Sequence, residues 1–152
     1  MAFAVIRVRG QADVRHEISR TMELLNLTRV NHCVIVPEDD VTIGMLQKSK
    51  DYITWGEVSP ETVAEMIRSR GRLAGDKEID DVFLKESGYS SVEEMASALA
   101  EGKAKMNRLG AKPVFRLAPP VKGYEGIKRA YRSGGALGYR GEAINDLIMR
   151  MI

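Results

Sequence analysis

The first 58 residues alternate between strand-like and helix-like patterns, and this alternation limits the fold more than any other feature of the chain. Residues 3–9, 32–36 and 52–58 are apolar stretches enriched in β-branched or aromatic side chains, which is typical of strands. The stretches between them repeat apolar residues at helical spacing. The order β-α-β-α-β is therefore predicted before residue 59.

Both helices expected in this part have start signals. The acidic segment 38–40 places carboxylates at the positive end of the second helix. One side of that helix is expected to carry Ile43, Leu46 and the stem of Lys50. Asp13 can cap the first helix, whose apolar face is expected to consist of Val14, Ile18, Met22 and Leu25.

Residues 59–111 are expected to form a helical insertion. Ser59 followed by Pro60 predicts a helix start, and that helix is expected to end at Gly71. Two further helices are predicted within residues 78–101, separated by a break at residues 87–88. The region is acidic and shows no catalytic spacing, so we expect it to face solvent or another protein.

Charge is distributed unevenly along the chain. Residues 103–152 contain eleven Lys or Arg against three acids, an excess of eight positive charges. Residues 1–102 contain twelve Lys or Arg against eighteen acids, an excess of six negative charges. Such asymmetry is typical of a protein that presents one face to a polyanion.

The C-terminal part, residues 112–152, is interpreted as a basic, glycine-rich extension. Residues 112–117 predict a strand that ends at Pro119 and Pro120. Residues 121–141 contain six glycines and five basic residues with three interleaved tyrosines, and they are expected to be irregular. A closing helix over residues 142–151 is expected to pack on the core through Ile144, Leu147, Ile148 and Met151.

Nothing in the sequence predicts an enzyme or a cofactor. His32 and Cys33 are strand neighbours that point to opposite faces, so they cannot act as a dyad. Two histidines and one cysteine do not make a zinc set. Residues 134–141 are glycine-rich, but they lack the Lys-Ser/Thr ending of a phosphate loop. No cofactor and no metal are expected.

A cytoplasmic location is expected. No stretch is apolar for long enough to cross a membrane, and the arginines of the N-terminus follow its apolar part, opposite to the order in a signal peptide. The single cysteine, Cys33, is expected to be a small core residue of a protein in a reducing compartment.

Two blocks of sequence resemble a known family. The first comprises residues 3–10, 22–37, 44–46 and 53–57, which include Asn31-His-Cys-Val-Ile-Val-Pro37 and Ile53-Thr-Trp-Gly-Glu57. The second comprises residues 115–120, 134–138 and 144–148, which include Phe115-Arg-Leu-Ala-Pro-Pro120 and Gly134-Gly-Ala-Leu-Gly138. Over essentially its whole length the chain resembles the archaeal branch of the ribosomal protein family numbered thirty in bacteria and seven in eukaryotes. It departs from the eukaryotic form by lacking a basic N-terminal arm.

This resemblance implies an α+β fold, with a ferredoxin-like β-α-β-α-β core (residues 1–58) and a small antiparallel sheet. It also implies a non-enzymatic structural protein of the large ribosomal subunit, located in the cytoplasm and in contact with large-subunit rRNA. 5S rRNA and neighbouring large-subunit proteins are further candidate partners, and no membrane contact is expected.

The residues expected to contact RNA are cations, because phosphates dominate such interfaces. Glycine would let backbone N–H groups approach phosphates, and tyrosine could stack on an unpaired base. Two alternatives stay open: a free-standing RNA-binding regulatory domain, and a small-molecule-binding domain that uses residues 134–141. The expected RNA contacts are Arg7, Arg9, Arg29, His32, Lys48, Lys50, Arg116, Lys122, Lys128, Arg129, Arg132 and Arg140.

Overall fold

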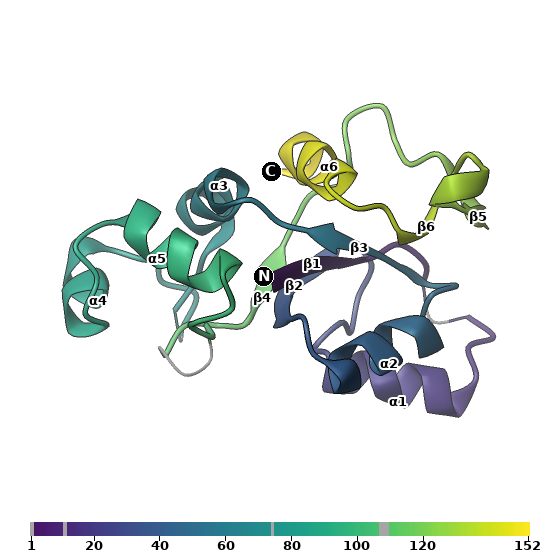
Figure 1. The fold of residues 1–152 in the computed structure, drawn as a ribbon, viewed down its shortest axis with the longest axis horizontal. Coiled ribbons are helices and arrows are strands. Elements are labelled where there is room, and N and C mark those ends of the chain that lie inside the picture. Colours follow the sequence, from purple (N-terminus) through teal and green to yellow (C-terminus); the bar gives the residue numbers. More distant parts are fainter. Residues whose placement is uncertain (1, 11, 74, 107–109) are drawn as a thin grey trace.

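The computed structural model describes residues 2–10, 12–73, 75–106 and 110–152. One six-stranded sheet runs through the molecule, with helices on both faces and a helical lobe at one end (Figure 1). The strands are β1 (Ala2–Arg7), β2 (His32–Pro37), β3 (Ile53–Glu57), β4 (Val114–Arg116), β5 (Gly126–Ala130) and β6 (Gly135–Tyr139). The helices are α1 (His16–Leu24), α2 (Asp40–Lys48), α3 (Pro60–Arg70), α4 (Asp81–Glu86), α5 (Val92–Ala100), α6 (Ala143–Met151) and the short 3₁₀ helix η2 (Tyr131–Ser133).

The sheet has the strand order β4-β2-β1-β3-β6-β5. β1 lies antiparallel between β2 and β3, and β4 lies antiparallel beside β2. β6 runs parallel to β3, and β5 runs parallel to β6. The α+β class and the β-α-β-α-β order are confirmed, and the antiparallel part of the sheet is extended by a parallel pair of strands at one edge.

Side-chain caps explain where most helices begin. The Asp39 carboxylate accepts the Thr42 N–H at 2.7 Å, and the Ser59 hydroxyl accepts the Thr62 N–H at 3.3 Å. Asp80 and Ser91 cap α4 and α5 in the same way. The expected cap at Asp13 is wrong: α1 starts at His16 without a side-chain cap, and Asp13 has a φ of 56° in the approach to it.

The two faces of the sheet bury separate apolar clusters because side chains alternate along each strand. Phe3, Val5 and Trp55 face α1 and α2, together with Met22 and Leu46. Ala4, Ile6 and Cys33 face the other way, toward α3, α5 and α6. In α2, Leu46 is buried as expected, whereas Ile43 is 38% exposed.

The lobe formed by α3, α4 and α5 confirms the expected helices between residues 60 and 100. Met95, Ala96 and Leu99 of α5 are buried, and they belong to the same cluster as Met66 and Ile67 of α3. Isolated bridges join Arg72 to Glu78 and Leu73 to Ala111, so the lobe is tied to the segment that leads into β4.

The expectation that residues 121–141 are irregular is wrong, since this stretch contains β5, η2 and β6. Its glycines permit close backbone packing: a Cβ on Gly135 would lie 2.1 Å from the Arg129 carbonyl oxygen. β6 pairs with β3, which lies about eighty residues earlier in the chain, through Thr54 with Gly138 and Trp55 with Tyr139. The closing helix α6 buries Ile144, Leu147, Ile148 and Met151, as expected.

Candidate nucleic-acid interface

A groove of about 410 Å³ lies between the C-terminal end of α2 and the β5–η2–β6 segment. Three cations and three aromatic side chains line it: Lys50, Lys128, Arg132, Trp55, Tyr131 and Tyr139. Asp51 is the one acid among its lining residues. The structure thus brings together three of the twelve expected RNA contacts, which come from two segments nearly eighty residues apart. We call this surface the aromatic groove.

The rings of the aromatic groove are held by fixed partners. The Tyr139 hydroxyl donates to the Glu57 carboxylate, with oxygen–oxygen distances of 2.6 and 2.7 Å. That hydrogen bond, with burial and the Glu57 charge, raises the pKa of Tyr139 to about 12. The Trp55 and Tyr139 ring centroids lie 6.4 Å apart, and the Tyr131 ring lies 4.8 Å from the guanidinium carbon of Arg140. Trp55 is buried and supports the groove from below, whereas Tyr131 and Tyr139 are partly exposed and can stack on bases without a large loss of side-chain entropy.

Arg140 was expected to contact RNA, but its guanidinium is buried beneath the groove. The residue is 6% exposed, and it donates from Nε to the Thr54 hydroxyl and from Nη2 to the Ala136 carbonyl oxygen, each at 2.8 Å. Burial lowers the pKa of Arg140 below the usual arginine value. Its physical role is to tie β3 to β6, because a buried guanidinium is stable only where its donors find acceptors.

Arg7 is buried as well, at 2% exposure. Its Nε donates to the Arg9 carbonyl oxygen at 2.9 Å, and its Nη1 donates to the Leu27 carbonyl oxygen at 2.8 Å. Burial lowers the pKa of Arg7. In this conformation neither Arg7 nor Arg140 reaches the surface, so the structure departs from the sequence-based expectation at both positions.

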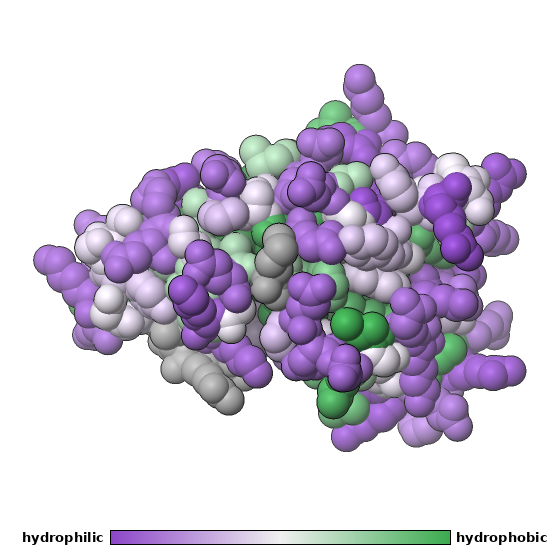
Figure 2. Space-filling model, in the orientation of Figure 1, coloured by the Kyte–Doolittle hydropathy of each residue, from purple (hydrophilic) through white to green (hydrophobic). Residues whose placement is uncertain are grey.

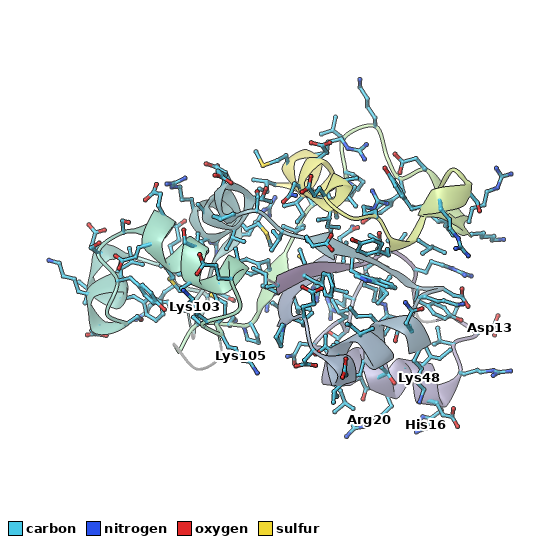
Figure 3. All side chains as sticks on the ribbon, in the orientation of Figure 1. Asp13, His16, Arg20, Lys48, Lys103 and Lys105 are labelled. Atoms are coloured by element: carbon cyan, nitrogen blue, oxygen red, sulfur yellow. The ribbon has the colours of Figure 1, made fainter. Side chains whose placement is uncertain are left out.

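The other expected contacts lie outside the aromatic groove. Arg9 is half-buried, with its guanidinium carbon 5.1 Å from the centroid of the Tyr52 ring. In the region of α2, the face that Figure 2 displays carries both hydrophilic and hydrophobic atoms. Lys48 is exposed on α2 (Figure 3). Lys122 and Arg129 are exposed on the C-terminal part.

A second group of cations gathers at the opposite edge of the sheet. His32 and Arg116 are paired across β2 and β4. Burial lowers the pKa of His32, and the nearby charges of Arg116, Arg29 and Arg7 lower it further. Cys33, by contrast, faces the other side of the sheet and is fully buried, which raises the pKa of its thiol. His32 and Cys33 therefore lie on opposite faces, as expected.

Sequence reasoning missed several residues at both places. Trp55 was assigned only to a strand, yet it lines the aromatic groove. Arg70, Arg72 and Lys112 lie in a recess with Arg116, although none of the three was expected to contact RNA. The alternation of Lys112, Val114 and Arg116 along an edge strand was the available signal, because alternate residues share a face.

The described part of the chain shows neither a cluster of metal ligands nor a membrane-spanning helix. Within residues 2–10, 12–73, 75–106 and 110–152, no group of three His, Cys, Asp or Glu side chains could hold a metal ion. In the same ranges, no helix is long and apolar enough to cross a membrane.

Comparison with known proteins adds the family. Residues 3–53 match the profile described as Ribosomal protein L30p/L7e. The chain is 51% identical over 152 residues to the large ribosomal subunit protein uL30 of Nanoarchaeum equitans (strain Kin4-M), across 99% of this chain and 98% of that protein. It is 48% identical over 151 residues to the uL30 protein of Methanosphaera stadtmanae, across 99% of both chains. It is 49% identical over 154 residues to the uL30 protein of Methanococcus vannielii, across 100% of both.

These relatives agree with the fold and with the resemblance seen in the sequence. The family profile covers β1 to α2 and ends at Ile53, where β3 begins, and the relatives extend the similarity through β3, the helical lobe and the β5–η2–β6 segment to the C-terminus. Because identity near one half extends over the whole length of each partner, the chain belongs to the L30p/L7e family of ribosomal proteins.

Proposed function

We propose that this chain is a structural constituent of the large ribosomal subunit, and that its aromatic groove is a contact surface for rRNA. The family supports the place in the large subunit, and with it a location in the cytoplasm and an association with rRNA and ribosomal proteins. The observation that carries the groove assignment is the meeting of Lys50, Lys128 and Arg132 with three aromatic side chains.

The chemistry of the aromatic groove suits single-stranded or looped RNA. Lys and Arg neutralise backbone phosphates and release counterions, which supplies affinity without sequence specificity. Tyr131 is 38% exposed and Tyr139 is 51% exposed, so part of each ring is available to stack on an unpaired base. The groove therefore favours phosphate contacts and stacking over readout of base edges.

The outlying cations extend this proposal. Lys48, Arg129 and Lys122 are exposed, and Arg9 is half-buried. We assign them to peripheral phosphate contacts. We also propose that residues 1–58 form the RNA-binding core, residues 59–111 form an insertion that faces solvent or protein, and residues 112–152 form a basic extension held by α6. A contact with 5S rRNA belongs to the same proposal.

No catalytic step is part of the proposed function. Cys33 is fully buried with a raised thiol pKa, which disfavours the nucleophilic thiolate. The small-molecule alternative loses support because Gly135, Ala136 and Leu137 are buried within the sheet. They belong to β6, which pairs with β5 through Gly135 and Leu137 and with β3 through Gly138 and Tyr139.

The test uses the double variant Lys128→Gln, Arg132→Gln and large-subunit rRNA. Each lost phosphate contact should lower the slope of log affinity against log salt by roughly 0.7–0.9, so the double variant should lower it by roughly 1.5. The matched control is Lys85→Gln, Lys103→Gln, which removes two exposed cations: Lys85 of α4 and Lys103, which follows α5 (Lys103 is labelled in Figure 3). An unchanged slope in the groove variant, or an equal change in the control, would contradict the groove assignment.

Sedimentation tests the wider proposal. The wild-type chain should sediment with large subunits at moderate salt and should be released at high salt, because the contacts are largely electrostatic. A chain that stays in the soluble fraction at physiological salt would favour the free-standing RNA-binding alternative.

A further inference from the structure

A recess of about 180 Å³ lies where the loop after α3 meets the edge strand β4. It is lined by Arg70, Arg72, Asp76, Lys112, Val114 and Arg116. The Lys112 N–H donates to the Arg72 carbonyl oxygen at 2.9 Å, which joins Arg72 to the segment that leads into β4. We call this feature the basic recess.

The basic recess carries more positive charge than its own residues neutralise. Four of its lining side chains are cationic, and Asp76 is the one carboxylate among them. Asp76 accepts a hydrogen bond from Lys112 Nζ at 2.5 Å and lies 3.5 Å from Arg116 Nη1. Three positive charges are therefore left in excess within a small volume, and like charges held this close favour a bound anion.

Arg29 adds to this excess. It lies close enough to His32, which is paired with Arg116 across β2 and β4, for its charge to lower the pKa of that imidazole. Arg29 and Arg116 are both exposed. The positive surface thus continues from the basic recess along the end of β2.

We propose that the basic recess binds phosphate groups of a second stretch of RNA backbone, separate from the RNA at the aromatic groove. This inference rests on the proposed function and deepens it. Three of the four cations are arginines, whose planar forks match phosphate oxygens in a bidentate manner.

The sheet separates the two surfaces. β4 and β5 are opposite edges of the six-stranded sheet, so five strand spacings of about 4.8 Å place Arg116 and Lys128 roughly 24 Å apart. One phosphate, or two adjacent ones, cannot bridge that distance, given a rise of about 3.4 Å per nucleotide along one strand. Between the two surfaces, α1 and α2 cover the central strands (Figure 1). RNA that occupies both surfaces must therefore contribute phosphates that are about seven or more nucleotides apart along one strand, or that belong to two strands, and the chain braces them at a set distance.

The acidic helices of the lobe restrict how RNA can approach. Asp81, Glu86, Glu93 and Glu94 are exposed on α4 and α5, and they would repel a phosphate backbone. The basic recess lies where this lobe joins the sheet, so RNA is expected to touch the insertion at the recess and not along its helices.

The test compares nucleotide protection in complexes of the full chain with large-subunit rRNA. The variant Arg72→Gln, Arg116→Gln should remove protection from one stretch of RNA and lower the salt slope by roughly 1.5. The groove variant Lys128→Gln, Arg132→Gln should remove protection from a different stretch. Unfolding midpoints equal to that of the wild type would confirm that both variants fold.

Asp76→Asn gives a test that misfolding cannot imitate. Removal of the carboxylate frees Lys112 and Arg116, and it should tighten RNA binding roughly fivefold at low salt, the order expected for one contact between unit charges in water. Unchanged affinity, together with unchanged protection in Arg72→Gln, Arg116→Gln, would overturn the second site.

The remaining outcomes are also decisive. If both variants lose protection of the same nucleotides, the proposal that the two surfaces bind different stretches of RNA is wrong. Full RNA protection with loss of a neighbouring protein from reconstituted subunits would reassign the basic recess to an acidic protein partner. A wild-type chain that protects no rRNA would overturn the proposed function itself. That result is distinguishable from failure of the second site, which would appear only in the variants.

Discussion

The Nε of Arg140 donates a hydrogen bond to the Thr54 hydroxyl at 2.8 Å, and that hydroxyl donates in turn to the Gly138 carbonyl oxygen at 2.8 Å. Thr54 lies on β3, whereas Gly138 and Arg140 belong to β6 and the residue that follows it. The same guanidinium faces the Tyr131 ring. One buried cation therefore joins the core sheet to the strand that carries one wall of the aromatic groove.

Replacement of Arg140 by Met should destabilise the protein. The change leaves the Ala136 carbonyl oxygen without its donor and removes the charged hydrogen bond to Thr54, so the free energy of unfolding should fall by roughly 2–4 kcal/mol. Urea unfolding measures this loss, on condition that the slope of the unfolding free energy against urea concentration is the same in the variant and the wild type. Arg132→Met is the control, because that exposed side chain should change stability by only about 0.5 kcal/mol. Equal urea midpoints for Arg140→Met and Arg132→Met would contradict a stabilising role for the hydrogen bonds by which Arg140 joins β3 to β6.

Gly56 should not tolerate a side chain. A Cβ at this position would lie 1.9 Å from the Gly141 carbonyl oxygen, so Gly56→Ala must push β3 away from the turn before α6. We expect a loss of about 1–3 kcal/mol in unfolding free energy. Gly44→Ala is the matched control: its Cβ would meet nothing within 4 Å in α2, and alanine should stabilise that helix by about 0.5–1 kcal/mol. Two variants of similar stability would show that the contact relaxes without cost.

Tyr131 should contribute to RNA binding through its ring and not through charge. Tyr131→Ala is expected to weaken RNA binding by about 1–3 kcal/mol, the usual contribution of one stacked base, with no change in the salt slope. Tyr131→Phe keeps the ring and should keep the affinity. Filter binding across a series of salt concentrations separates the two effects. A loss of equal size in Tyr131→Phe would assign the contribution to the hydroxyl instead.

His32 should make stability depend on pH. Burial and three arginines lower the pKa of His32 from its ordinary value of 6.5, so the unfolded chain binds its proton more readily than the folded chain does. This contribution to stability is present above pH 6.5 and is lost as the pH falls below that value. His32→Gln should flatten this part of the stability profile. If the basic recess takes a phosphate, RNA binding should raise the pKa of His32, which NMR titration of the imidazole would detect. A pKa that RNA leaves unchanged would place phosphate away from His32.

Much of the fold follows from local patterns in the sequence. The apolar stretches around Val5, Val34 and Trp55 became β1, β2 and β3, because β-branched and aromatic side chains suit a half-buried pleated surface. Ser59 with Pro60 became the start of α3, because a cap needs only residues that are neighbours in the chain. The expected start at Asp13 failed because a left-handed backbone at that residue carries it away from the first turn.

The candidate site was predictable only in part. The sequence by itself determined the family, the alternating core and the excess of positive charge toward the C-terminus, because these depend on residue identity and near neighbours. The tertiary structure decided which cations are available. Arg7 and Arg140 are buried, with their guanidinium groups donating to internal carbonyl and hydroxyl oxygens. Lys128 and Arg132 instead line a groove together with Lys50. The tertiary structure also ordered residues 126–139 by pairing β6 with β3 and brought Arg72 beside Arg116. Such pairings join residues that are far apart in the chain. Their stability depends on burial and on close backbone contact, and neither can be predicted from the local pattern of charged residues or glycines.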